Sequence, residues 1–252
     1  MDPRLAERRR HVLEERARGG VRRVVWLVAL VMVIGALAWL LQSPWLSVSN
    51  IEVSGQQRAD VEGALARSGL ELGRPLLLVP ADGALEQLLA DPWVADATVD
   101  RLFPDTIEIR LIEYQPAAVV ESGSKRTVIS EGGVALARDA ESLLPTIRLD
   151  AAEPPLGSVF EDDRVTGAAS FFASLEPPYL SGAVLFESEG ELWVKLGEYL
   201  IRLGRPIEMP QKAAALAAVL GDDQPDGAVI NVIAPTRPTV QIDGGPRPST
   251  DG

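Results

Sequence analysis

The sequence of 252 residues contains no cysteine and a single histidine, His11. The missing cysteine excludes disulfide bonds, thiolate zinc sites and cysteine nucleophiles. Because the one histidine lies in an arginine-rich segment, the chain cannot assemble a Ser-His-Asp triad or a multi-histidine metal site by itself. The sequence therefore predicts no catalytic residue, no cofactor and no metal ligand.

Basic residues are concentrated at the start of the chain. Residues 1–23 contain eight arginines and four acidic residues, a net charge of +4, so the remainder must carry −16 for the chain to total −12. Binding to DNA or RNA depends heavily on the neutralisation of phosphates. An acidic main body of this kind argues against a nucleic-acid partner.

An uncharged apolar run follows the arginines. It reads VVWLVALVMVIGALAWLL and covers the eighteen positions 24–41. At ~1.5 Å per residue such a helix spans roughly 27 Å, close to the ~30 Å hydrocarbon core of a bilayer. Trp26, Trp39 and Trp45 fit interfacial anchors, and the positive-inside rule places residues 1–23 in the cytoplasm. We predict a basic cytoplasmic tail over 1–23, a transmembrane helix in the lipid bilayer over 24–41, and an extracytoplasmic main body.

Two other interpretations of this run stay open. A buried helix of a soluble protein can be equally apolar. A cleaved signal peptide is the second, since Ala36-Leu37-Ala38 resembles a cleavage site. That tripeptide lies inside the run, however, and eighteen residues exceed the usual apolar region of about 7–15. We therefore predict a retained, single-pass type II anchor in the plasma (inner) membrane.

The next seventy residues alternate between strand and helix patterns. LSVSNIEV, residues 46–53, predicts a strand. Asp60 is placed to cap a helix that stops at Gly69, and Asp82 to cap a second helix. The segments 93–101 and 106–111 have the period-2 alternation of a hairpin. The predicted order is β-α-α-β-β, in which two helices can cover one face of a three-stranded sheet.

The hairpin ends in the pattern R-x-x-P-D-T-I-x-I-x-x-x-E-x-x-P-A. Its residues are Arg101, Pro104, Asp105, Thr106, Ile107, Ile109, Glu113, Pro116 and Ala117. Together with the basic tail, the single span and the β-α-α-β-β unit just beyond it, this pattern resembles the FtsQ/DivIB cell-division proteins. The resemblance implies a POTRA domain, here over residues 46–116, that contacts other membrane proteins of the division complex. From its position at a strand end, we expect Glu113 to pair with Arg101 or Arg110.

Beyond residue 117 the pattern changes to short strands with glycine turns and two helices, near 164–175 and 209–220. We predict a mostly antiparallel β domain with flanking helices over 117–243, whose sheet continues the first, and a disordered tail over 244–252. The fold class is α+β. The helix-and-strand arrangement of this half is also similar to the second domain of the FtsQ/DivIB family.

Two acidic pairs were candidates for acid–base chemistry. Asp162-Asp163 and Asp222-Asp223 could divide acid and base roles, as paired carboxylates do in glycosidases. Both pairs adjoin helix ends, where capping or solvated acids are common. We therefore expect them to cap helices or to be solvated. GEYLIRLGRP lacks the spacing of a phosphate-binding loop.

The last strands carry the predicted partner surface. Pro235 and Pro238 lie beside the final apolar segment, and proline in a sheet is confined to edges, strand starts and bulges. An edge strand can accept a strand from a partner. The resemblance implies that this region receives an FtsB/DivIC-type partner, and the predicted contact residues are Ile230, Val232, Thr239, Val240 and Gln241. That the prolines only protect the edge against aggregation is the alternative.

The resemblance implies a divisome scaffold at the division septum rather than an enzyme. It would bind FtsB/DivIC-like and FtsL-like bitopic division proteins and support septal peptidoglycan synthesis. Two alternatives stay open. One is a membrane-anchored envelope enzyme acting on peptidoglycan, which would need a reactive group in a cleft. The other is a POTRA-bearing transport or assembly component, which would be expected to carry tandem POTRA units or a membrane barrel.

Overall fold

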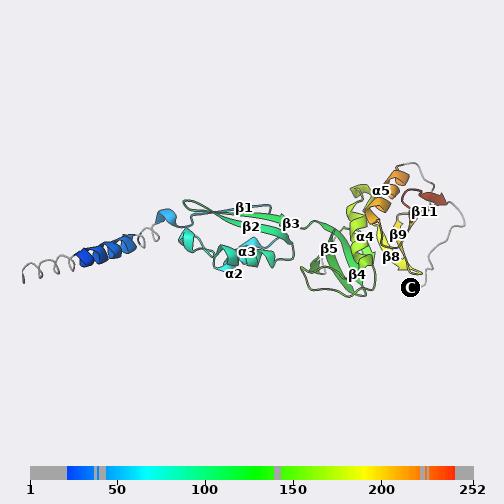
Figure 1. Cartoon of the computed structure of the whole chain (residues 1–252). Helices are drawn as coiled ribbons and strands as arrows, with labels where there is room; N and C mark the ends of the chain where they lie inside the picture. Colours follow the sequence, from blue (N-terminus) through cyan, green and yellow to red (C-terminus); the bar gives the residue numbers. More distant parts are fainter. Residues whose placement is uncertain are drawn as a thin grey trace, which may run out of the picture.

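A computed structural model describes residues 22–36, 39, 44–138, 143–221, 225 and 227–241. The predicted cytoplasmic tail up to residue 21, residues 37, 38, 40 and 41 of the predicted span, and the predicted tail 244–252 lie outside these described residues. Figure 1 shows a helix, a small sheet with two helices and a larger sheet with its helices following one another along the molecule.

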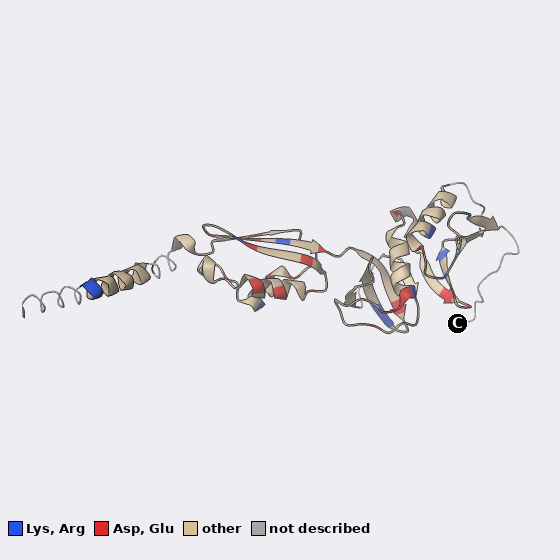
Figure 2. Cartoon of the chain, viewed as in Figure 1, with Lys and Arg blue, Asp and Glu red and all other residues tan. Residues whose placement is uncertain are grey.

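The first helix covers residues 22–36, and every one of its residues is exposed. Its large apolar side chains are exposed, among them Trp26 at 69% and Met32 at 71%. Arg22 and Arg23 carry its only charges, at the start (Figure 2). Within the described ranges, no helix combines the length and the apolar character needed to cross a bilayer.

The first sheet has three strands in the order β1-β3-β2. β1 (Asn50–Ser54) runs parallel to β3 (Thr106–Glu113), and β2 (Val94–Leu102) forms the antiparallel hairpin with β3. β3 alternates as its sequence predicts: Ile107, Ile109 and Leu111 are buried, whereas Arg110 is exposed. β1 begins later than predicted, because Pro44–Leu46 is a 3-10 turn, η1.

Two helices cover the buried face of this sheet. α2 (Val61–Ser68) and α3 (Ala81–Leu89) contribute Val61, Ala64 and Leu88 to its core, with the 3-10 turn η2 (Leu76–Leu78) between them. Asp60 caps α2 as predicted, since its carboxylate accepts from the Gly63 N–H at 3.0 Å. Asp82 does not cap α3. The helix begins at Ala81 after Pro80, so Asp82 lies inside the first turn.

The second sheet has nine strands in the order β12-β11-β10-β9-β8-β7-β4-β5-β6. The strands are β4 (Pro116–Ser122), β5 (Lys125–Ser130), β6 (Ala135–Arg138), β7 (Thr146–Arg148), β8 (Val184–Ser188), β9 (Glu191–Leu196), β10 (Tyr199–Gly204), β11 (Val229–Asn231) and β12 (Thr239–Gln241). It is separate from the first sheet, so the prediction that one sheet continues the other is wrong. Tyr114 and Gln115 are the only residues between β3 and β4, and the chain changes sheet there.

Antiparallel pairs predominate in the second sheet, but three neighbouring pairs are parallel: β4·β7, β7·β8 and β10·β11. Parallel neighbours need a crossover connection. The helix α4 (Asp163–Ala173), followed by the turn η3 (Pro177–Tyr179), supplies one between β7 and β8. The helix α5 (Met209–Leu220) supplies another between β10 and β11. Phe171, Phe172 and Leu216 are fully buried in the core between these helices and the sheet.

The two sheets meet around Trp93. Its ring packs with Tyr114 against a small buried cluster that includes Val119 of β4 and Val128 of β5. The Tyr114 N–H donates to the Trp93 carbonyl at 2.9 Å, and the Arg58 guanidinium lies 5.2 Å from the Trp93 ring centroid. We call residues 44–115, with the three-stranded sheet, the first body, and the residues from 116 on, with the nine-stranded sheet, the second body. Side chains of the first body therefore contribute to the packing at the start of the second.

Candidate partner-binding edge

β12 is the outermost strand at one end of the nine-stranded sheet. Ile230 of β11 lies opposite Val240, and Asn231 lies opposite Thr239. Among the described residues, β12 pairs only with β11. Thr239 and Gln241 are exposed, whereas Val240 is half-buried against the core. Pro238 immediately precedes the strand, as proline at a strand start does.

The hydrogen bonds of β11 define which backbone groups of β12 are free. The Val232 N–H donates to the Arg202 carbonyl at 3.1 Å, and the Leu200 N–H donates to the Ala228 carbonyl at 3.2 Å. Successive residues of a strand direct their backbone groups to opposite sides. Residues 228, 230 and 232 therefore face β10, and 229 and 231 face β12. Since these pair with residues 241 and 239, the N–H and C=O of Val240 point to the free side.

Ile230 and Val232 lie under this edge. Both are fully buried and belong to the core of the second body. Their side chains are thus directed into the protein, where Val240 packs against the same core. Of the five predicted contact residues, three lie on the outer strand. Ile230 and Val232 are buried beneath it, so they can support the strand but do not present a surface to a partner.

The opposite end of the sheet is closed by the chain itself. Val134 and Val159 form an antiparallel bridge. The Ala135 N–H donates to the Ser158 carbonyl at 2.9 Å, and the Gly157 N–H donates back to the Ala135 carbonyl at 2.8 Å. The loop 155–160 therefore covers the start of β6, which is a common protection for a sheet edge. The sequence indicated no role for this loop.

A buried lysine fixes the chain beside the candidate edge. Lys212 of α5 is buried, and its Nζ donates to the carbonyls of Leu203 at 2.8 Å and Arg205 at 2.7 Å. Burial lowers the pKa of Lys212, an effect that the nearby Glu208 carboxylate opposes. The two hydrogen bonds join α5 to the end of β10, the strand on which β11 is built.

Glu113 has a role that the sequence did not indicate. The prediction that it pairs with Arg101 or Arg110 is wrong: Arg101 donates to the Val79 carbonyl, and Arg110 pairs with Asp100 and Glu108. The buried Glu113 carboxylate instead accepts from three successive backbone N–H groups, those of residues 57, 58 and 59, at 2.7–3.0 Å.

These contacts also determine the charge state of Glu113. Burial alone raises the pKa of the Glu113 carboxyl, but the three backbone donors together outweigh burial and lower it below its usual range. The carboxylate thus joins the end of β3 to the loop that leads into α2. The sequence carries no signal for this contact, because the donors are backbone N–H groups that almost any residue can supply.

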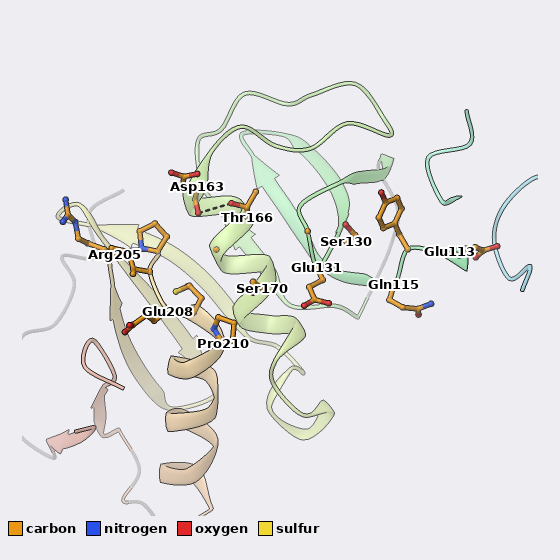
Figure 3. A pocket seen from close by; sticks show the side chains of 16 residues that line it. Glu113, Gln115, Ser130, Glu131, Asp163, Thr166, Ser170, Arg205, Glu208 and Pro210 are labelled. Carbon is orange, nitrogen blue, oxygen red and sulfur yellow. Dashed lines mark hydrogen bonds between the residues drawn. The ribbon is translucent and has the colours of Figure 1, made fainter. Parts of the chain in front are cut away.

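A groove of about 1070 Å³ lies where the first body meets α4 and α5 (Figure 3). Tyr114 and Gln115 line one side, and residues 205–210 line the other. The Thr166 hydroxyl, the dashed contact in Figure 3, donates to the Asp163 carbonyl at 3.3 Å. Ser130 Oγ accepts from the Val134 N–H at 3.1 Å. These hydroxyls support local turns, and the groove favours no particular chemical step.

Of the acidic pair at α4, Asp162 caps the helix as expected, whereas Asp163 is the first residue of the helix. Asp162 accepts from the Arg164 N–H at 2.9 Å, and its carboxylate also pairs with the Arg164 guanidinium, which contacts Glu187 as well. The hydrogen bonds from the Arg164 side chain lower the pKa of Asp162 against the opposing effect of burial. Asp222 and Asp223 lie outside the described residues. No cluster of acidic or histidine side chains within the described ranges could hold a metal ion.

Comparison with known proteins agrees with the fold. Residues 46–114 match the model of the POTRA domain of FtsQ type. Over 107 residues the chain is 37% identical to the cell division protein FtsQ of Corynebacterium glutamicum, which covers 42% of this chain and 47% of that protein. It is 28% identical over 228 residues to FtsQ of Mycolicibacterium smegmatis, covering 88% of this chain and 66% of the relative. With FtsQ of Streptomyces bingchenggensis the identity is 28%, over 84% of this chain and 83% of the relative.

Proposed function

Because the chain belongs to the FtsQ family of cell-division proteins, we propose that it serves as a scaffold of the bacterial division complex. In this role it links FtsB/DivIC-like and FtsL-like bitopic proteins at the septum and supports septal peptidoglycan synthesis without performing a reaction itself. Residues 117–243 provide the docking domain, and residues 46–116 connect it to the membrane.

The proposal includes a membrane anchor over residues 24–41 with residues 1–23 in the cytoplasm. The exposed helix 22–36 supports it, because a helix that is apolar on all sides requires either a protein core or a bilayer around it. Arg22 and Arg23 at its start fit the cytoplasmic end of a span (Figure 2).

The observation that carries the docking proposal is the difference between the two ends of the nine-stranded sheet. The loop 155–160 covers the β6 end, whereas β12 keeps the N–H and C=O of Val240 free. A partner strand that adds to β12 gains backbone hydrogen bonds, and alternate side chains supply specificity. Thr239, Val240 and Gln241 form the contact strand, while Ile230 and Val232 support it from the core.

The test replaces Val240 by proline. Val240→Pro removes the outward N–H while leaving the N–H groups that face β11, so the variant should keep its circular dichroism spectrum. It should lose at least about tenfold in affinity for the purified extracytoplasmic segment of the FtsB/DivIC-like protein, since one lost hydrogen bond and a steric block on the ladder exceed ~1.4 kcal/mol.

Val240→Ile is the matched control, because it keeps both the N–H and an apolar side chain, and its affinity should stay unchanged. Wild-type affinity in a folded Val240→Pro variant would place the docking surface elsewhere. Depletion of the protein tests the division role itself: filaments without septa are expected, and normal septation contradicts the proposal.

A further inference from the structure

Large apolar side chains are exposed at the end of the first body where the chain enters from the helix 22–36. They lie on three segments, and we call them the proximal patch. Its members are Trp45, Leu72, Leu77, Leu78, Leu102 and Phe103. Trp45 is 85% exposed, and Leu78 and Phe103 are each 64% exposed. Contiguous exposed apolar surface on a folded domain marks an interaction site more often than isolated apolar residues do.

Backbone contacts hold the three segments of the proximal patch together. The Val48 N–H donates to the Arg74 carbonyl at 2.8 Å, and the Gly73 N–H donates to the Val48 carbonyl at 2.8 Å. The Ser49 N–H donates to the Asp105 carbonyl at 2.9 Å in the β2–β3 turn. Segments 45–49, 72–79 and 101–105 therefore form one end of the first body.

This end faces the helix 22–36 in Figure 1, and β3 leaves toward the second body from the opposite end. Trp45 follows four positions after residue 41, where the apolar run ends. Four extended residues span at most about 14 Å. If residues 24–41 cross the bilayer, Trp45 thus lies in or next to the headgroup layer, which extends roughly 5–8 Å beyond the hydrocarbon on each side.

We propose that the proximal patch lies on the lipid bilayer. Through this patch the first body rests on the outer face of the plasma (inner) membrane. The inference rests on the proposed anchor at residues 24–41. A tryptophan, a phenylalanine and several leucines are the side chains that partition at the headgroup boundary. Two of the neighbouring charged groups are engaged within the first body, because Arg101 donates to the Val79 carbonyl and Asp105 accepts from the Ser49 and Thr106 hydroxyls.

Contact with the membrane at this end would limit the angles at which the first body can tilt. Because the second body follows directly after Gln115 and shares the Trp93 cluster with the first, the contact would also limit the height of β12 above the membrane. The proximal patch therefore helps to hold β12, the proposed docking edge, within reach of partners that are anchored in the same bilayer.

The absence of cysteine makes the test direct. Single variants Leu78→Cys and Phe103→Cys carry a nitroxide label in the full chain, reconstituted in nanodiscs of phosphatidylethanolamine and phosphatidylglycerol. Ile112→Cys is the matched control, since Ile112 is 63% exposed in the same body but near its opposite end. The accessibility of each label to oxygen, which partitions into lipid, is compared with that to a water-soluble nickel chelate.

We expect the oxygen-to-nickel ratio at positions 78 and 103 to exceed that at position 112 several-fold. An equal ratio at all three positions overturns the inference. Protection from both reagents at 78 and 103 also overturns it, since that pattern indicates contact with protein, such as a second copy.

A fourth label, at Ile34→Cys, separates this inference from the proposed function. A lipid-like ratio at 34 with water-like ratios at 78 and 103 leaves the anchor intact and rejects the membrane contact of the proximal patch. A water-like ratio at 34 rejects the anchor and, with it, this inference.

Discussion

The two ends of the nine-stranded sheet differ, because a loop covers the outer strand at one end, whereas the outer strand at the other end is left open. At the β6 end, the loop 155–160 forms backbone hydrogen bonds with the start of the strand. Phe160 of this loop is almost fully buried. At the β12 end, only a three-residue strand closes the sheet, and its outer backbone groups have no partner within the described residues. A protein that needed only to prevent aggregation would cover both ends. The difference supports the proposal that the uncovered end receives a partner strand.

The largest expected effect comes from disturbing the closed end. Phe160→Ala removes a buried ring from the core and should lower the free energy of unfolding by about 3–5 kcal/mol. Urea denaturation, followed by tryptophan fluorescence, to which the buried Trp193 of β9 contributes, measures it. At low temperature, where the variant stays folded, partner capture at β12 should be normal. Loss of capture in that folded variant would contradict the independence of the two ends.

The junction between the two bodies should respond to Glu113→Gln. The carboxylate accepts three backbone N–H groups, and replacing its charge should cost about 1.5–3 kcal/mol of stability at pH 7. Because folding lowers the pKa of Glu113, its contribution is complete above its unfolded pKa of about 4.3. The contribution is lost as the pH falls through the lower folded pKa.

Urea titrations of wild type and Glu113→Gln at pH 7 and at about pH 3 measure this dependence. The two proteins should differ most at pH 7 and converge in acid. A difference in stability that stays constant with pH would mean that the charge of Glu113 is not what joins β3 to the loop 57–59.

A pair of proline variants separates the two faces of β12. Thr239→Pro removes an N–H that faces β11, so hydrogen exchange at residues 229–231 should become about tenfold faster, as expected for the loss of one hydrogen bond worth ~1 kcal/mol or slightly more. Val240→Pro should leave this exchange unchanged while abolishing partner capture. Faster exchange in both variants would show that Val240 also bonds to β11, contrary to the alternation of β11 and β12.

The smallest effect separates a true cap from an acid that only resembles one. Asp60→Ala should cost about 1 kcal/mol because it leaves the Gly63 N–H without its acceptor. Asp82→Ala, inside the first turn of α3, should cost only a few tenths of a kcal/mol through the helix dipole. Thermal unfolding of the two variants measures the difference, and equal shifts would contradict the cap assignment.

Local patterns predicted the elements well. Alternation at Ile107, Ile109 and Leu111 predicted β3, and Asp60 with Gly69 predicted both ends of α2. Pro235 and Pro238 predicted a sheet edge near the end of the chain, where β12 lies. Each of these features depends on residues that are close in sequence, so the residue types alone can predict it.

Features that depend on distant backbone groups could not be predicted in this way. The donors to Glu113 come from the loop 57–59, and the cover of β6 comes from residues 155–160. Neither set of bonds requires a particular side chain from both partners. That the second sheet is separate from the first was missed for the same reason, although the predicted change of pattern after residue 116 lies next to Gln115, where the chain changes sheet. Which strands pair is a property of the tertiary fold.

The short connection at Tyr114 and Gln115 gives the molecule a mechanical property. A partner that pulls along β12 loads its three residue pairs with β11 in shear, so that their hydrogen bonds share the force. From β11 the load passes through a continuous sheet to β4. Only Tyr114 and Gln115 separate β4 from β3, so no slack linker lies between the two sheets. Trp93 and Tyr114 also pack against the cluster formed by β4 and β5, which adds a side-chain contact between the two bodies to the covalent connection. Tension applied at β12 is thereby passed from the second sheet to the first instead of being taken up by a linker between them.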